Sequence, residues 1–182
     1  MPTWIALFRG INVGGKNILP MVELKRVLES AGCENIRSYI QSGNLVVSSS
    51  TKSKRLLTGK MLKATEESFG FRPNLVLLSV AEFSSAIQNN PFPVAVAAPK
   101  TLHFFFLETQ PTSPDLDGIA KLASPSEQFR LIDKVFYLYT PEGLGTSRLA
   151  NSAERKLGVY ATARNFNTVL AIAEMVSGKK RA

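Results

Sequence analysis

The sequence predicts an α+β protein made of two small α/β subdomains, and three observations support this fold class. Short apolar runs alternate with helical patterns along the whole chain. Over the first 80 residues the predicted order is strand, helix, strand, strand, helix, strand, which is the order of a ferredoxin-like split βαβ unit. Prolines at positions 91, 93 and 99 then forbid a continuous element and predict a boundary.

In the first subdomain, strands are predicted at residues 3–8, 36–41, 45–48 and 75–78, and helices at 20–31 and 52–69. The fixed φ of Pro20 suits the first turn of a helix, and apolar residues recur at helical spacing up to Ala31. The turn formers Ser42, Gly43 and Asn44 separate two apolar runs, which predicts a hairpin.

The second subdomain is predicted as a related βαββα unit with a C-terminal helix. Its strands cover residues 102–107, 130–132 and 135–139, and its helices follow Ser113 or Asp115, run from 147 to 157, and begin finally near Asn165 or Asn167. The domain assignment is therefore residues 1–80 for the ferredoxin-like subdomain, 81–99 for a helix and a Pro-rich connection, and 100–182 for the second α+β subdomain.

The composition indicates which classes of partner, compartment and binding site fit this chain. A chain of 182 residues with 45% hydrophobic and 20% charged residues is typical of a soluble protein, and without a long apolar run or a secretory start we expect it to be cytoplasmic and not membrane-bound. Its formal charge of +8 favours anionic partners. One cysteine, Cys33, excludes an internal disulfide, and with a single histidine no metal site is predicted.

The single histidine, His103, lies inside an apolar strand, and no serine or cysteine stands at a recognisable nucleophile spacing from it. We therefore predict a core imidazole with one hydrogen-bond partner, which excludes most Ser-His and Cys-His chemistry.

A glycine-rich loop follows the first strand. Residues 10–16, GINVGGK, fit the G-x-x-x-x-G-K part of a phosphate-binding loop, with Lys16 as the cation. Asn17 stands where that motif has a hydroxyl ligand for Mg²⁺, however, and Pro20 delays the helix by about a turn. Three interpretations remain: a nucleotide-hydrolysing loop of an ATPase or GTPase, an anion cradle of another geometry, or a structural glycine loop.

Two further polar clusters have both a structural and a functional interpretation. Residues 41–44, QSGN, either present polar groups at a sheet edge or form an ordinary hairpin turn. Residues 164–168, RNFNT, surround a predicted helix N-terminus, where free N–H groups favour anions. Arg9 ends a buried apolar run, so its guanidinium must reach water, a carboxylate partner or a ligand.

Three ordered motifs carry a family resemblance. Residues 8–15 (FRGINVGG), 39–44 (YIQSGN) and 162–168 (TARNFNT) together resemble the DUF1697 family, a group of bacterial proteins of unknown function and similar length. The family usually has tryptophan where this chain has Phe166. The resemblance implies a two-part α/β structure, and it implies no activity, cofactor or catalytic residue.

We expect the three clusters to line one cleft between the subdomains, where an anionic ligand binds: a phosphorylated small molecule, a nucleotide or single-stranded nucleic acid. Phe166 or Tyr39 would supply base stacking. The predicted ligand-binding residues are Arg9, Asn12, Gly14, Gly15, Lys16, Gln41, Ser42, Asn44, Arg164, Asn165 and Asn167. The alternatives are a transferase or hydrolase acting on a phosphorylated small molecule, and a protein-interaction module. The sequence identifies no cofactor, catalytic residue or oligomeric state.

Overall fold

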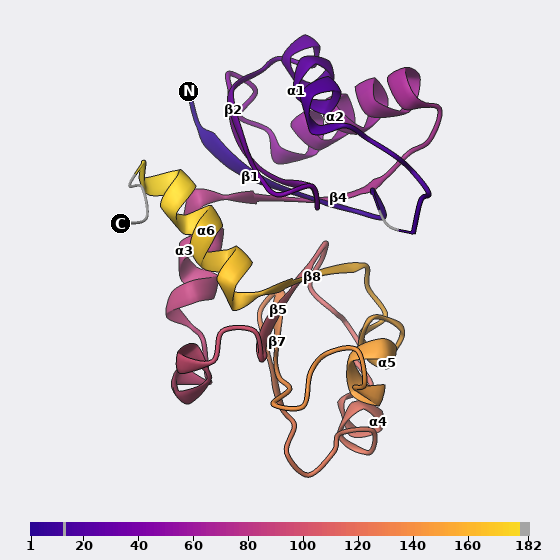
Figure 1. Ribbon diagram of the computed structural model, residues 1–182, viewed down its shortest axis with the longest axis vertical. Helices are drawn as coiled ribbons and strands as arrows, with labels where there is room; N and C mark the ends of the chain where they lie inside the picture. Colours follow the sequence, from indigo (N-terminus) through magenta and orange to yellow (C-terminus); the bar gives the residue numbers. More distant parts are fainter. Residues whose placement is uncertain (13, 179–182) are drawn as a thin grey trace. The chain divides into compact units, whose positions relative to one another are not determined.

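The structure is a computed structural model that describes residues 1–12 and 14–178 (Figure 1). The chain divides into two compact units, unit 1 with Met1–Ser85 and the segment from Ala171 onward, and unit 2 with Ala86–Leu170. Helix α3 (Val80–Gln88) carries the chain from unit 1 into unit 2, and helix α6 (Phe166–Ser177) carries it back.

Unit 1 has the predicted element order. Its elements are β1 (Thr3–Arg9), α1 (Met21–Ser30), β2 (Cys33–Tyr39), β3 (Asn44–Ser49), α2 (Lys54–Phe69) and β4 (Asn74–Ser79). The sheet has the order β2-β3-β1-β4, and every neighbouring pair is antiparallel. Since β1 and β2 both run antiparallel to β3, they are parallel to each other with β3 between them, as a split βαβ unit requires.

The core of unit 1 lies between this sheet and its two helices. Trp4, Ala6 and Phe8 alternate along β1 and join one apolar cluster with Leu24 of α1 and Leu57 of α2. Figure 1 shows both helices on the same side of the sheet. The period of two along the strand and the helical spacing of the buried positions therefore produce a two-layer packing.

Unit 2 repeats this strand order. It contains the 3₁₀ helix η1 (Pro93–Ala97), β5 (Leu102–Leu107), α4 (Leu116–Ala120), β6 (Gln128–Ile132), β7 (Val135–Tyr139), α5 (Arg148–Leu157) and β8 (Ala161–Asn165). Its antiparallel sheet has the order β6-β7-β5-β8. Phe105 and Phe136 of the sheet pack with Ile119 of α4 and Leu149 of α5. The fold class of two small α/β units is thus confirmed.

Two differences from the sequence prediction have physical causes. Strand β8 was not predicted, because its five residues, ATARN, lack an apolar alternation and are held by pairing with β5. Strand β2 runs from Cys33 to Tyr39 rather than over 36–41, because the register shifts between Glu34 and Arg37, where Asn35 has a φ of 52°.

Candidate functional site

Asn12 joins two of the three predicted clusters. Its Nδ2 donates hydrogen bonds to the carbonyl oxygens of Leu19 and Gln41, both at 2.9 Å, and its Oδ1 accepts one from the N–H of Leu19 at 2.7 Å. Asn12 has a φ of 54°, a left-handed conformation that asparagine tolerates better than most residues. The structure therefore brings the glycine loop and the β2–β3 turn together, and the Asn12 side chain is occupied in holding them.

Further bonds fix the same loop. Asn17 donates from Nδ2 to the carbonyl oxygen of Gly10 at 2.8 Å, and the N–H of Asn12 donates to the carbonyl oxygen of Asn17 at 3.0 Å. The N–H of Phe8 donates to the carbonyl oxygen of Gly43 at 2.8 Å. A Cβ on Gly43 would lie 2.7 Å from the Cβ of Phe8, so glycine is required there by close packing.

Asn44, a predicted ligand-binding residue, is fully buried. Its Nδ2 donates to the Ser42 Oγ at 2.8 Å and to the carbonyl oxygen of Tyr39 at 3.3 Å. These bonds stabilise the turn from inside, because a buried amide that lost them would carry an uncompensated desolvation cost.

The remaining cluster residues of unit 1 face solvent. They are Arg9, Gly14, Gly15, Lys16, Gln41 and Ser42. Gly14 and Gly15 have φ values of 58° and 73°, and a Cβ on either would meet no atom within 4 Å. Glycine is therefore needed there for the backbone conformation, and the space beside the loop is open. Val13, part of the same motif, lies outside the described residues.

The third cluster belongs to unit 2. Arg164 in β8 donates from Nη1 to the Thr162 Oγ1 at 2.7 Å and to the carbonyl oxygen of Ala163 at 2.9 Å. The Oδ1 of Asn165 accepts the N–H of Thr168 at 3.0 Å, so Asn165 caps α6, and Asn167 is half-buried in its first turn. That these residues share one surface with the clusters of unit 1 stays a prediction.

Phe166 does not supply the stacking surface that the sequence suggested. Its ring is buried, with 4% of its surface exposed, and its centroid lies 5.5 Å from that of Phe104. The aromatic position in this motif is thus part of the packing of unit 2. Tyr39 is half-buried at the end of β2.

The titratable groups of the interior argue against nucleophilic chemistry there. Burial raises the pKa of the Cys33 thiol to about 11, so the thiol stays protonated at neutral pH. Burial lowers the pKa of His103 to about 4, so the imidazole is neutral. Among the described residues, none lies within hydrogen-bonding distance of its buried Nδ1.

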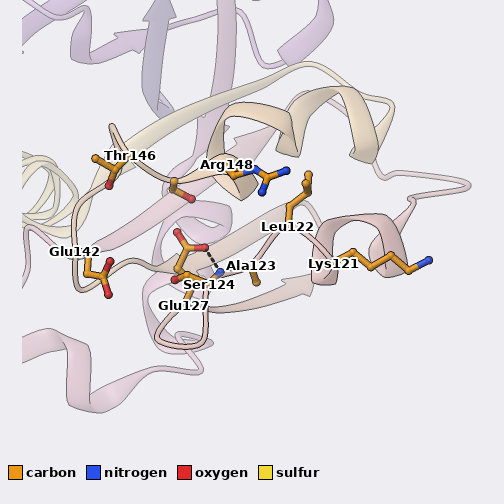
Figure 2. A pocket seen from close by; sticks show the side chains of 9 residues that line it. Lys121, Leu122, Ala123, Ser124, Glu127, Glu142, Thr146 and Arg148 are labelled. Carbon is orange, nitrogen blue, oxygen red and sulfur yellow. Dashed lines mark hydrogen bonds between the residues drawn. The ribbon is translucent and has the colours of Figure 1, made fainter.

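Sequence reasoning missed a polar pocket in unit 2, drawn in Figure 2. It has a volume of about 250 Å³ and lies between the segment after α4 and the loop before α5. Its lining residues are Lys121, Leu122, Ala123, Ser124, Glu127, Glu142, Thr146, Ser147 and Arg148. They fit no known motif, and only the fold brings the two segments together, so no sequence signal was available.

The described residues contain neither a cluster suited to a metal ion nor a helix suited to a membrane. No group of three or more histidine, cysteine, aspartate or glutamate side chains is placed to hold a metal ion within residues 1–12 and 14–178. Over the same ranges, no helix combines the length and the apolar character needed to cross a membrane.

Comparisons with known proteins agree with the resemblance in the motifs. Residues 1–137 match the family model described as "Protein of unknown function (DUF1697)". A solved structure, described as that of conserved bacterial protein SP0830 from Streptococcus pneumoniae, superposes with a TM-score of 0.74 at 26% identity, covering 97% of this chain and 99% of that one. No protein with a curated description matches the chain.

Proposed function

The chain belongs to the DUF1697 family, whose description assigns no function, and we propose that unit 1 binds an anionic ligand through the exposed loop between β1 and α1. One observation carries the proposal. Gly14 and Gly15 hold left-handed conformations beside open space, in a loop that Asn12 fixes to the β2–β3 turn. Such a loop allows a ligand to approach the backbone closely.

The side chains around this loop suit a phosphate. Lys16 and Arg9 are exposed cations, and Gln41 and Ser42 are exposed hydrogen-bonding groups on the adjacent turn. Asn12 and Asn44 would act indirectly, since their amides hold the loop and the turn in place. A loop fixed before the ligand arrives loses less conformational entropy on binding. Arg164, Asn165 and Asn167 remain proposed contributors from unit 2.

The test is a titration with three probes, namely ATP, inorganic pyrophosphate and a fluorescein-labelled oligothymidylate, at about 50 and 200 mM salt. We expect binding of at least one probe, weakened about tenfold, or about 1.4 kcal/mol, by Lys16→Gln. Lys52→Gln is the matched control, because it removes an exposed cation of unit 1 outside the loop.

The probes also separate the ligand classes. A strand of nucleic acid would bind with a steep salt dependence that Lys16→Gln makes shallower by about one counterion. A nucleotide or pyrophosphate would bind with a smaller salt effect, and release of phosphate from bound ATP would favour the enzyme alternative. Binding of no probe, or equal binding by the Lys16 and Lys52 variants, would refute the proposal.

A second candidate, the protein-interaction module, is favoured by exposed apolar side chains near the same loop. Ile18 and Ile40 are 66% and 56% exposed, and each precedes a residue whose carbonyl oxygen accepts a bond from Asn12. Apolar side chains so placed mark contact surfaces when they form a patch. Light scattering of the wild type and of an Ile18→Ser/Ile40→Asn variant tests whether they join copies of the chain.

A further inference from the structure

The polar pocket of unit 2 separates positive from negative charge. Figure 2 shows Arg148 on one side and Glu142 on the other, with Glu127 and Ser124 joined at the base. Arg148 is the first residue of α5, and Lys121 follows α4. The carboxylates come from the start of β6 and from the loop after β7.

Of the two cations, Arg148 has no partner in the part of the chain that the structure describes, whereas Lys121 interacts electrostatically with Asp115. No hydrogen bond or ion pair of the Arg148 guanidinium or the Lys121 ammonium occurs within residues 1–12 and 14–178. By contrast, the salt bridge from Lys156 to Asp115 at 2.7 Å shows that a cation of the same unit does pair where a carboxylate is in reach. The charge at Arg148 is therefore available to a ligand.

Each of the two carboxylates is held in place by a hydrogen bond to one of its oxygen atoms, and its other oxygen atom accepts none from the described residues. Oε2 of Glu127 accepts the N–H of Ser124 at 2.9 Å, and Oε1 of Glu142 accepts the Ser126 hydroxyl at 3.0 Å. Within the described residues, the other oxygen of each has no hydrogen-bond partner. A carboxylate accepts up to about four hydrogen bonds, so both keep capacity for a donor.

From this arrangement we infer that the pocket binds a small zwitterion, namely a free α-amino acid. Its carboxylate would lie against Arg148, where the N-terminal end of the α5 dipole adds positive potential, and its ammonium would lie against Glu127 and Glu142. An anion alone would meet two carboxylates, and a cation alone would meet Arg148. Only a ligand with both charges finds complementary partners on each side.

The size of the pocket agrees with this class. A volume of about 250 Å³ lies below the roughly 300–1,000 Å³ of pockets that take drug-sized ligands. A free amino acid fits this space. The inference concerns unit 2 alone and is independent of anion binding by unit 1.

The test is calorimetric titration with each standard L-amino acid at millimolar concentration. For any that binds, the Nα-acetyl form removes the ammonium and the carboxamide form removes the carboxylate. We expect each capped form to bind at least about tenfold more weakly, which corresponds to about 1.4 kcal/mol.

Two variants test whether the carboxylate of the amino acid binds Arg148 and its ammonium binds Glu142. Arg148→Gln should weaken the free amino acid about tenfold and remove its advantage over the carboxamide, while Glu142→Gln should remove its advantage over the acetyl form. Arg155→Gln, on the exposed surface of the same helix and outside the pocket, should change neither. Far-ultraviolet circular dichroism confirms that each variant is folded.

Three results of the amino-acid titrations would overturn the inference. They are the absence of binding by every amino acid, equal affinity for the free and capped forms, and unchanged binding by both Arg148→Gln and Glu142→Gln. Tighter binding of inorganic phosphate than of any amino acid would also overturn it, because it would identify a site for simple anions.

Discussion

The hairpin turn of unit 1 and that of unit 2 each place one residue at a φ of 49°, but the residue types differ. In unit 1 it is Ile40, after β2, and in unit 2 it is Asp133, between β6 and β7. Aspartate tolerates the left-handed conformation, whereas a β-branched residue there is a genuine outlier. Unit 1 thus retains strain in an exposed turn that unit 2 avoids.

The connections that follow the first strand of each unit also differ, and again unit 1 has the more unusual backbone. In unit 1, residues 10–12 and 14–20 belong to a loop fixed by Asn12 and shaped by glycines with positive φ. In unit 2, residues 108–114 connect β5 to Asp115, which caps α4 and pairs with Lys156. One strand order therefore supports an ordinary connection in one unit and an elaborate one in the other, and such differences locate function in loops rather than in the framework.

The largest expected effect comes from Gly43→Ala, because its Cβ would lie 2.7 Å from the Cβ of Phe8 and 2.9 Å from the Cδ1 of Ile11. Adding the cost of a left-handed conformation, we expect a loss of about 4 kcal/mol in the free energy of unfolding. Urea unfolding followed by Trp4, the single tryptophan and a core residue of unit 1, measures it.

Gly15→Ala is the matched control for that prediction. Its φ of 73° nearly equals the 74° of Gly43, but a Cβ there meets no atom within 4 Å. It should cost only about 1 kcal/mol. Equal losses in the two variants would show that the contact with Phe8 is unimportant.

The second effect is a pH dependence confined to unit 2, which holds the single histidine. Burial lowers the pKa of His103 from 6.5 to about 4. Below pH 6.5 this histidine binds a proton in the unfolded chain but not in the folded chain, so its contribution to stability falls between pH 6.5 and about 4. This loss is at most about 3.5 kcal/mol, at roughly 1.4 kcal/mol per pKa unit.

Urea unfolding followed by circular dichroism across this pH range measures that loss. His103→Leu, which keeps an apolar side chain inside β5, should flatten the dependence. An equally steep fall in the variant would assign the acid sensitivity to other groups.

The third prediction tests the hydrogen bonds by which Asn12 fixes the loop of unit 1. Asn12→Ala removes three hydrogen bonds, one to Gln41 in the β2–β3 turn and two to Leu19 in the loop, and we expect a loss of about 2 kcal/mol. Asn17→Ala removes one bond of an exposed side chain and should cost about 1 kcal/mol or less. Urea unfolding followed by Trp4 fluorescence compares the free energies of unfolding of the two variants. Equal losses would show that Asn12 stabilises the loop no more than Asn17 does.

The smallest expected change in stability comes from exchanging the residue types of the two turns, at Ile40 and Asp133. Ile40→Asp should stabilise the protein by about 1 kcal/mol, because Ile40 is mostly exposed and loses little burial. Asp133→Ile should destabilise it by a similar amount. Thermal unfolding measures both, and changes of the same sign would show that φ at these turns does not determine stability.

The sequence predicted those parts of the fold that depend on local apolar patterns. Strands β5 and β7 have the predicted bounds, since both are continuous apolar runs. Strand β8 was missed because Thr162, Arg164 and Asn165 give no such pattern, and only pairing with β5 makes the segment extended. Asp115, one of the two caps predicted for this helix, caps α4, and Ser147, predicted at the start of the next helix, caps α5; a cap depends only on residues three positions away.

The candidate site was less predictable. Asn12 donates a hydrogen bond to Gln41, 29 positions along the chain, and neither motif predicts this contact. Asn12 was predicted to contact a ligand, but in the structure its side chain stabilises the loop. Asn44 was selected as a polar turn residue, but its position opposite Leu7 in the sheet places it in the interior. Burial set by strand pairing lies beyond what local spacing predicts.

The return of α6 to unit 1 has a practical consequence for shortened forms of this protein. Removing the chain from Ala171 onward would damage unit 1, although unit 2 is its neighbour in the sequence. A fragment cut where the family match stops, at residue 137, would end inside β7 and lack the α6 segment too. Unit 1 is therefore encoded in two separate segments, and deletions that are meant to keep unit 1 must retain both.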